Sequence, residues 1–229
     1  MRFRRLIFLG LGASLALTPG AFADTTTWAN ITSGAAGTNG SASGNIGSVD
    51  FTYTGETYFV NLSGNTTNYF QPTSTYTSAT VTNAPTDGAL IAITGTDTEH
   101  TITFSAPVTG LIFSEVSLGQ PSIDTMYTFN QEFTVLSCGP NATYGGGCFN
   151  QGVGTSGFTL SGSEADGTIE FLGPITSLSW TGANPETWNG FDIGLLAQST
   201  SPVPEPSSLM LLGTGLLSGV AAMRRRLRR

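Results

Sequence analysis

Three acidic side chains, Glu164, Asp166 and Glu170, stand close together in the chain. Because side chains along a strand alternate between its two faces, this spacing would place all three carboxylates on one face. Paired carboxylates supply the acid and base of glycoside hydrolysis, so the three residues are acid candidates. The glycine at position 167 instead favours a turn that separates Glu164 from Glu170. We therefore expect no enzyme, with a glycoside hydrolase as the alternative.

The same turn suits a cation better than a sugar substrate. Calcium takes about six to eight hard oxygen ligands, and Glu164 and Asp166 offer such oxygens on a tight turn. Asp124, Glu186 or Asp192 would complete the shell from neighbouring loops. The sequence has no recognised calcium-binding spacing. We therefore expect no cofactor and an ordinary solvated turn, with calcium at Glu164 and Asp166 as the alternative.

The single histidine and two aromatic residues complete the list of candidate site residues. His100 lies in an alternating segment without a G-x-S-x-G motif, which favours a structural histidine at a strand edge, bonded to a neighbour, over a catalytic base. Tyr144 and Trp188 stand beside turn residues, where their rings would be free to stack on a sugar face. We expect core packing to be the role of Trp188, with glycan binding by Tyr144 and Trp188 as the alternative.

Cys138 and Cys148 are the only cysteines in the chain. The residues between them are rich in glycine, which favours a chain that turns back on itself. In an oxidising exterior such a pair predicts a disulfide, and closing this loop would stabilise the fold by about 2 to 3 kcal/mol. A metal site would need more ligands than two thiols and the distant His100.

The body of the chain alternates apolar and polar residues with a period of two, and no segment has a helical apolar stripe. Turn residues separate the segments at intervals too short for crossover helices. We therefore predict an all-β fold at residues 46–198, an antiparallel, jelly-roll-like β-sandwich. Residues 24–45 are poor in apolar side chains and predict a flexible arm. The strand candidates are 49–53, 57–62, 75–81, 89–93, 100–105, 108–117, 126–136, 158–161, 168–171, 175–180 and 190–196.

Every basic residue lies near the N-terminus or the C-terminus of the chain. Fourteen of the fifteen Asp and Glu residues lie between positions 24 and 203, where Lys and Arg do not occur, so the formal charge of this stretch is −14. Nucleic acid binding requires cations on the protein, so we exclude nucleic acid as a partner. Anionic lipids and phosphates are disfavoured for the same reason, whereas neutral sugars and divalent cations are compatible.

Both ends of the chain predict export. Arg2, Arg4 and Arg5 precede the apolar residues 6–17, and residues 21–23 have the small-x-small pattern of a signal peptidase site, which predicts a signal peptide at 1–23. A proline-rich linker at 199–206 precedes the uncharged residues 207–223, a predicted transmembrane helix for a bilayer core of about 30 Å. The arginines of the tail at 224–229 would remain in the cytoplasm.

These C-terminal features together resemble the PEP-CTERM sorting signal of Gram-negative bacteria. Pro204, Glu205 and Pro206 form the tripeptide, and the apolar span and the arginine cluster follow in the order of that family. The resemblance implies recognition by exosortase during passage through the inner membrane. It also implies delivery to the cell surface or to an extracellular, exopolysaccharide-rich matrix. A permanent single-pass anchor with a proline-rich stalk is the alternative.

Residues 98–196 resemble an ectodomain that recurs in PEP-CTERM proteins, through segments such as TITFSAPVTGLIFSEVSLGQP and ETWNGFDIG. This resemblance names a relative and implies no reaction. We therefore expect a non-enzymatic protein with a structural or adhesive role in an exopolysaccharide-associated matrix. The alternative is a glycan-binding or glycan-hydrolysing jelly roll at the cell surface.

Overall fold

The structure is a computed structural model that describes residues 25–140, 142–197, 224 and 226. The predicted signal peptide, the linker with Pro204, Glu205 and Pro206, and the predicted transmembrane helix at 207–223 lie outside these residues. Among the described residues, no helix has the length and apolar character needed to cross a membrane.

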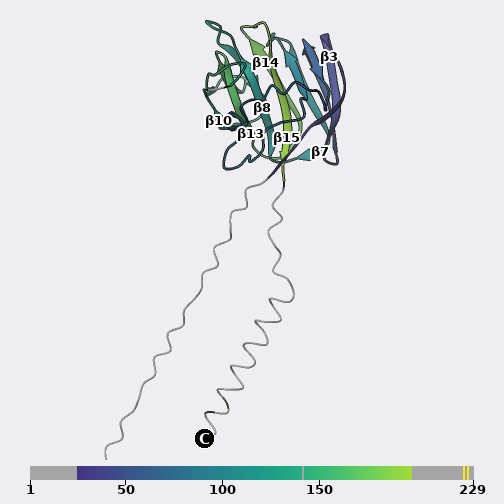
Figure 1. The fold of residues 1–229 in the computed structure, drawn as a ribbon, viewed down its shortest axis with the longest axis vertical. Coiled ribbons are helices and arrows are strands. Elements are labelled where there is room, and N and C mark those ends of the chain that lie inside the picture. Colours follow the sequence, from purple (N-terminus) through teal and green to yellow (C-terminus); the bar gives the residue numbers. More distant parts are fainter. Residues whose placement is uncertain (1–24, 141, 198–223, 225, 227–229) are drawn as a thin grey trace, which may run out of the picture.

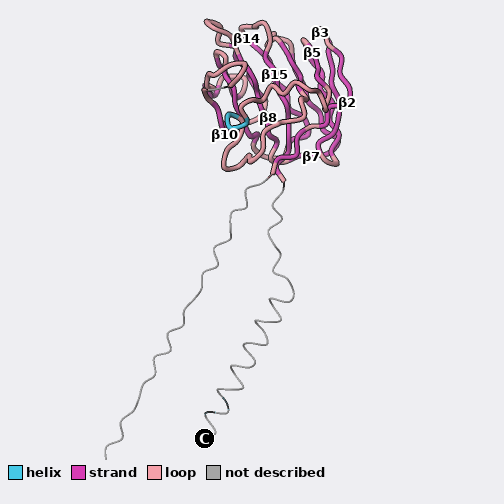
Figure 2. The backbone as a smooth tube through the Cα atoms, viewed as in Figure 1, coloured by secondary structure: helices cyan, strands magenta, loops and turns pink. Residues whose placement is uncertain are grey.

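The domain consists of two antiparallel sheets stacked face to face (Figures 1 and 2). The seven-stranded sheet has the order β10 (Phe133–Cys138), β13 (Ala165–Phe171), β8 (Leu111–Leu118), β15 (Asn189–Leu196), β6 (Leu90–Ile93) and β5 (Phe59–Asn61), and β1 (Thr26–Trp28) also pairs with β15. The eight-stranded sheet has the order β11 (Asn150–Val153), β12 (Phe158–Gly162), β9 (Thr125–Phe129), β14 (Ile175–Ala183), β7 (Glu99–Val108), β4 (Val49–Thr57), β3 (Gly37–Ile46) and β2 (Asn30–Ala35). The predicted antiparallel β-sandwich is confirmed.

Eight of these strands follow the jelly-roll order. The first, β6, pairs with the last, β15, and then β7 pairs with β14, β8 with β13, and β9 with β12. Successive pairs alternate between the two sheets. A long antiparallel hairpin rolled up in this way is the jelly-roll arrangement that the sequence predicted.

The core between the sheets is largely aromatic. Trp180 is buried, and its ring centroid lies 5.6 Å from that of Phe129 and 5.8 Å from that of Phe113. Phe113 in turn stacks on Phe191 at 4.6 Å. These side chains occupy alternate positions of their strands, so the period of two in the sequence directs them inward and the Ser and Thr residues of the eight-stranded sheet outward.

The predicted flexible arm at residues 24–45 is wrong, because this segment contributes the strands β1, β2 and β3. Ile31, Ala42 and Ile46 point into the core and are buried. The glycines between them permit close pairing of the strands: a Cβ atom on Gly44 would lie 2.0 Å from the carbonyl oxygen of Asn30. The low apolar content therefore reflects a tightly paired edge, and the domain begins well before the predicted residue 46.

Three predicted strands also need correction. Residues 75–81 form the end of the 3-10 helix η1 (Thr73–Thr75) and a loop, in which Tyr76 and Val81 are buried. The predicted strand 57–62 is divided between the end of β4 and β5, which belong to different sheets. The predicted strand 126–136 is two strands, β9 and β10, which belong to different sheets. Between them, Asn130 bonds to Ser179 of β14 through both its backbone N–H and its Oδ1.

A long loop at residues 62–89 covers the outer face of the seven-stranded sheet. Phe70 and Tyr76 of this loop pack against Val116 of β8 in a second buried apolar cluster. The Tyr76 hydroxyl donates to Asp166 Oδ1 at 3.1 Å, and the Tyr76 carbonyl accepts from the Thr168 hydroxyl at 3.0 Å. This sheet is therefore covered on both faces, which explains the burial of nearly every residue of β8 and β13.

The two ends of the domain lie side by side (Figure 1). The N–H of Ala197 donates to the carbonyl of Thr25 at 3.1 Å, and β1 pairs with the last residues of β15. Because β15 runs along the sandwich, its first residue, Asn189, lies at the opposite end. Residues 25 and 197, between which the domain lies, are therefore at the end remote from Asn189.

Candidate functional site

A group of aromatic rings lies near the end of the sandwich that is remote from residues 25 and 197. Each ring contacts the next in a continuous series. The distances between ring centroids are 5.7 Å from Tyr58 to Phe59, 5.8 Å from Phe59 to Trp188, 5.7 Å from Trp188 to Tyr69, and 5.1 Å from Tyr69 to Tyr144. We call these five residues the aromatic cluster.

The aromatic cluster packs on the domain on one side and is accessible to solvent on the other. Tyr58 is 53% exposed and Tyr144 is 37% exposed, while the other three rings are partly exposed. Phe59, Tyr69 and Trp188 also pack on the second buried cluster beneath the loop at 62–89. Flat apolar ring faces that are already held in place need little reorganisation to stack on a ligand.

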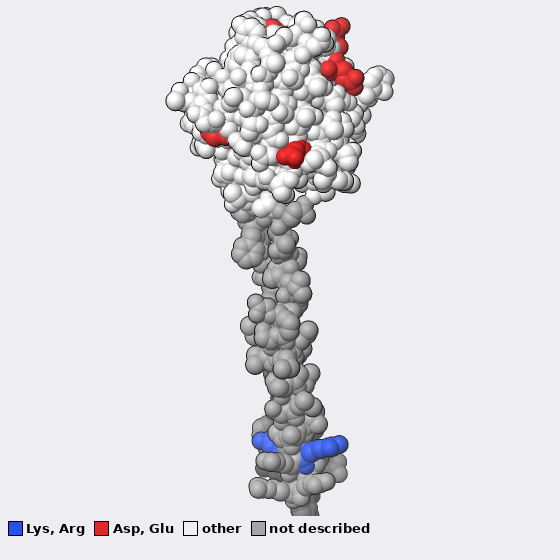
Figure 3. All heavy atoms as spheres, turned by 90° about the vertical axis from the view of Figure 1, so that its right-hand side faces the viewer, with Lys and Arg blue, Asp and Glu red and all other residues white. Residues whose placement is uncertain are grey.

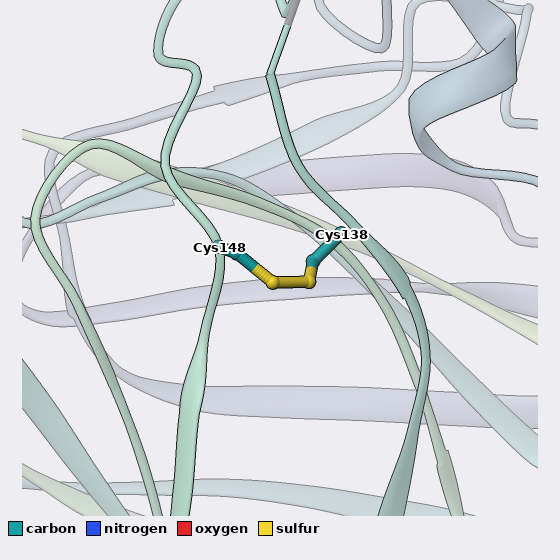
Figure 4. Close-up of a disulfide and its surroundings, with 2 residues drawn as sticks. All are labelled: Cys138 and Cys148. Atoms are coloured by element: carbon teal, nitrogen blue, oxygen red, sulfur yellow. A yellow bond between two sulfur atoms is a disulfide. The ribbon is translucent and has the colours of Figure 1, made fainter.

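The disulfide between Cys138 and Cys148 closes the segment that carries Tyr144 (Figure 4). Cys138 is the last residue of β10, and Cys148 precedes β11, which belongs to the other sheet. The predicted pairing of the two cysteines is therefore present. It ties one loop of the aromatic cluster to the strands of the sandwich.

The structure brings together the two aromatic residues that the sequence singled out. The ring centroids of Tyr144 and Trp188 lie 6.1 Å apart. Sequence reasoning missed Tyr58, Phe59 and Tyr69, although Tyr58 and Tyr69 each stand in a pair of aromatic residues beside turn residues, which is a readable signal. Glycan binding by Tyr144 and Trp188 remains the untested alternative to core packing.

The structure does not group the acid candidates as a catalytic pair. Glu164 precedes β13 in a left-handed conformation with φ of 55°, and the register of β13 shifts between Ala165 and Gly167. Asp166 is fully buried, whereas Glu170, farther along the strand, is partly exposed. A continuous strand with all three carboxylates on one face is therefore not formed, because the bulge interrupts the alternation.

Glu164 and Asp166 hold the end of the neighbouring strand instead. Asp166 Oδ1 accepts from the N–H of Ser117 at 2.9 Å, and Glu164 Oε2 accepts from the Ser117 hydroxyl at 2.9 Å. Ser117 has a φ of 61°, a conformation that costs a residue other than glycine free energy. The two carboxylates therefore stabilise a strained position at the end of β8.

The residues proposed to complete a calcium shell have partners of their own. Glu186 Oε1 accepts from the N–H of Gly119 at 2.5 Å, Asp192 Oδ1 accepts from the N–H of Ile193 at 2.8 Å, and Asp124 accepts from Ser161 at 3.5 Å. Within residues 25–140 and 142–197, no three Asp, Glu, His or Cys side chains are grouped as metal ligands. Calcium binding at Glu164 and Asp166 stays an untested alternative.

Several carboxyl groups are buried without a cationic partner. Glu115 on β8 is 1% exposed, and neither of its carboxyl oxygens has a hydrogen-bond partner in the described part of the chain. Burial, followed by repulsion from Glu186 and Asp166, raises the pKa of Glu115 well above its ordinary value. Burial also raises the pKa of Asp166 to about 6 and that of Glu186 to about 7. The folded domain therefore favours the protonated form of these groups.

His100 lies inside the sandwich on the interior strand β7, whereas the sequence predicted a structural histidine at a strand edge. It is fully buried, its Nδ1 lies 2.8 Å from the Tyr53 hydroxyl oxygen, and its ring stacks on Trp180 at 5.2 Å. Burial lowers the pKa of His100 to about 4, so the ring is neutral at neutral pH. His100 therefore adds no positive charge to the domain.

One face of the domain carries few charged side chains (Figure 3). Figure 3 shows a face on which acidic side chains are few and scattered. The sequence between residues 25 and 197 contains no Lys or Arg, so this part of the chain places no basic side chain near the aromatic cluster. Such a surface repels anions and leaves a neutral ligand as the chemistry that the rings suit.

Residues 202–226 match the family described as the PEP-CTERM protein-sorting motif. No curated protein and no solved structure matches the chain significantly. The matched segment includes Pro204, Glu205 and Pro206, so the predicted sorting signal is confirmed. The motif indicates an exported protein that is sorted by exosortase. The resemblance of residues 98–196 to a recurrent ectodomain remains a prediction.

Proposed function

We propose that this protein is a non-enzymatic, adhesive component of an exopolysaccharide-associated matrix at the surface of a Gram-negative bacterium. Its aromatic cluster binds a neutral polysaccharide of that matrix. The observation that carries the proposal is the continuous contact of five aromatic rings, exposed at Tyr58 and Tyr144, near one end of the domain.

The chemistry of the cluster suits sugar rings. The C–H groups on the face of a pyranose ring are apolar and stack on aromatic faces, while its hydroxyl groups remain in water. A chain of several aromatic rings contacts more than one sugar unit, so a polymer gains more binding energy than a single sugar. The absence of basic side chains between residues 25 and 197 favours a neutral polymer over an anionic one.

The position of the cluster supports adhesion. The sorting motif begins at residue 202, shortly after Ala197, whereas the cluster lies near the opposite end of the domain. In our proposal signal peptidase removes residues 1–23, and exosortase processes the chain while residues 207–223 lie in the inner membrane. The aromatic cluster then faces away from the attached end and is free to contact matrix polymers.

Hydrolysis of the polymer is the alternative that the carboxylates suggested. Glu164 and Asp166 are engaged with Ser117 of β8, and Tyr76 donates a further hydrogen bond to Asp166. A catalytic acid must reach the glycosidic oxygen of its substrate. The fully buried position of Asp166 supports binding over hydrolysis.

Single substitutions in the cluster test this proposal. We expect Trp188→Ala and Tyr144→Ala each to weaken binding to the exopolysaccharide of the host by about fivefold, because each removes a ring contact of about 1 kcal/mol. Affinity electrophoresis of the exported protein in gels that contain the polysaccharide measures this loss. Val153→Ala is the control, since Val153 is 80% exposed on β11 and lies outside the cluster.

Three results would count against this function. Equal retardation of all variants would show that the rings do not bind the polymer. Retardation only in gels that contain an anionic polysaccharide would contradict the neutral specificity. Release of reducing sugars that stops in Glu170→Gln would favour the hydrolase.

A further inference from the structure

The loop that carries Tyr144 contains little that would hold its shape. Residues 139, 145, 146 and 147 are glycines, and Gly139 and Gly146 have φ values of 136° and 138°, which other residues rarely adopt. Glycine-rich segments lose more conformational freedom on ordering than other segments do. The position of the Tyr144 ring therefore depends on contacts that close the loop from outside.

One set of contacts fixes the base of the loop on the start of β13. The N–H groups of Gly146 and Gly147 donate to the carbonyl of Glu164 at 2.9 and 2.6 Å, and the N–H of Asp166 donates to the carbonyl of Gly147 at 3.2 Å. The loop also packs directly on the Asp166 carboxylate, because a Cβ atom on Gly145 would lie 2.1 Å from Asp166 Oδ2.

The other contacts fix the two ends and the tip. The disulfide joins Cys138 to Cys148 across a separation of 10 residues. Near the tip, the N–H of Thr143 donates to the carbonyl of Gln71 at 2.8 Å, which places the next residue, Tyr144, against Tyr69 of the same long loop. Cys148 is exposed, so a small thiol reagent has access to the bond.

We infer that Cys138 and Cys148 are positioning residues of the aromatic cluster, whose disulfide holds the Tyr144 ring against Tyr69 and Trp188. This inference rests on the proposed function, because it assigns the disulfide a role in binding the polysaccharide. Reduction by a dithiol transfers two electrons and two protons to the bond, leaves two thiols, and oxidises the reagent to its own disulfide. Without the disulfide, the loop at 138–148 no longer holds Tyr144 in one position. The aromatic cluster then loses the ring of Tyr144.

The contact of the two rings tests the inference without any ligand. In NMR spectra of the exported protein, we expect a nuclear Overhauser effect between the Tyr144 ring and the Trp188 indole, whose centroids lie 6.1 Å apart. The signal should disappear in the double variant Cys138→Ser, Cys148→Ser and after treatment with dithiothreitol, and return on reoxidation of the native chain. A signal that persists without the disulfide would overturn the inference.

A thermodynamic cycle separates positioning from general stability. Loss of the disulfide should weaken binding to the host exopolysaccharide by about fivefold in the native background, the size of one ring contact, and leave affinity unchanged in the Tyr144→Ala background. Equal weakening in both backgrounds would mean that the disulfide acts only on the stability of the fold. If Tyr144→Ala alone leaves binding unchanged, the proposed function fails. The NMR result is independent of binding and still decides whether the disulfide positions the Tyr144 ring.

Gly145→Ala keeps both cysteines and disturbs the same loop. The added methyl group would collide with Asp166 Oδ2, so the loop must shift although the disulfide is intact. We expect this variant to lose the Tyr144–Trp188 contact as well. A native contact in Gly145→Ala would contradict the role of this packing in placing Tyr144.

Discussion

At the scale of single residues, the unusual feature of the domain is acid burial without cations. Glu115 is 1% exposed with both carboxyl oxygens unpartnered, Asp166 and Asp192 are similarly buried, and Asp192 Oδ2 also lacks a partner among the described residues. An ionised carboxylate in such surroundings is costly unless a cation compensates it, and the chain provides neither Lys nor Arg between residues 25 and 197. Protonation therefore stabilises the fold.

This burial predicts that the domain is most stable in mild acid. The pKa of Asp166 rises from 3.8 to about 6 on folding, and that of Glu186 from 4.5 to about 7. The folded state therefore binds protons more tightly than the unfolded state, and the free energy of unfolding falls as pH rises from about 4 to 7. Urea unfolding measured across this range checks the sign, and stability that rises with pH would contradict it.

Glu115→Gln should remove part of this dependence. The amide cannot ionise, so we expect the variant to be more stable than the native protein by about 1 kcal/mol at pH 7, with little difference at pH 4. The matched control is Glu132→Gln, because Glu132 is exposed in the turn between β9 and β10. An unchanged pH profile in Glu115→Gln would show that another group dominates the titration.

At the scale of elements, the sequence predicted strands where alternation was regular and failed where small residues or long-range contacts decided the structure. The period of two located β4, β7 and β14 and their inward residues. The strands β2 and β3 escaped prediction because their Ser, Gly and Ala residues resemble a linker, although Ile31 and Ala42 are buried. Part of the loop at 62–89 was predicted as a strand because it contains the apolar residues Tyr76 and Val81. These side chains are buried against the outer face of a sheet and not within a strand.

The candidate site shows the same limit. Tyr144 and Trp188 were recognisable from neighbouring turn residues, but their contact depends on a disulfide loop and on the start of β15, which are far apart in the sequence. Tyr69 joins them only because the long loop folds back over the seven-stranded sheet. Residue types therefore predicted the candidate residues, whereas their contacts with one another depend on the topology of the fold.

A substitution in β3 tests whether the N-terminal strands are integral. Gly44→Ala would place a methyl group 2.0 Å from the carbonyl oxygen of Asn30 in β2, so we expect the free energy of unfolding to fall by about 1 to 3 kcal/mol. Asn39→Ala is the control, since Asn39 is an exposed residue of the same strand. If both variants melted at the native temperature, residues 24–45 would behave as the flexible arm that the structure rejects.

At the scale of the whole molecule, the basic residues and the sorting motif lie in the terminal segments, whereas the acidic residues and the aromatic cluster lie in the domain. All eight basic residues lie in the terminal segments, and the sorting motif at 202–226 includes three of the five C-terminal arginines. The domain between them is acidic and has its aromatic cluster near the end remote from that motif. This division suits a protein that is exported, processed at its C-terminus and retained outside the cell by contacts with a neutral polymer.

Retention in the matrix of the host tests the central claim most directly. The protein and a variant with Tyr58→Ala, Tyr144→Ala and Trp188→Ala should be exported equally, since the sorting motif is untouched. After the exopolysaccharide is separated from cells and medium, we predict the native protein in the polysaccharide fraction and the variant in the medium. Equal retention of both proteins by the polysaccharide would contradict binding through the aromatic cluster.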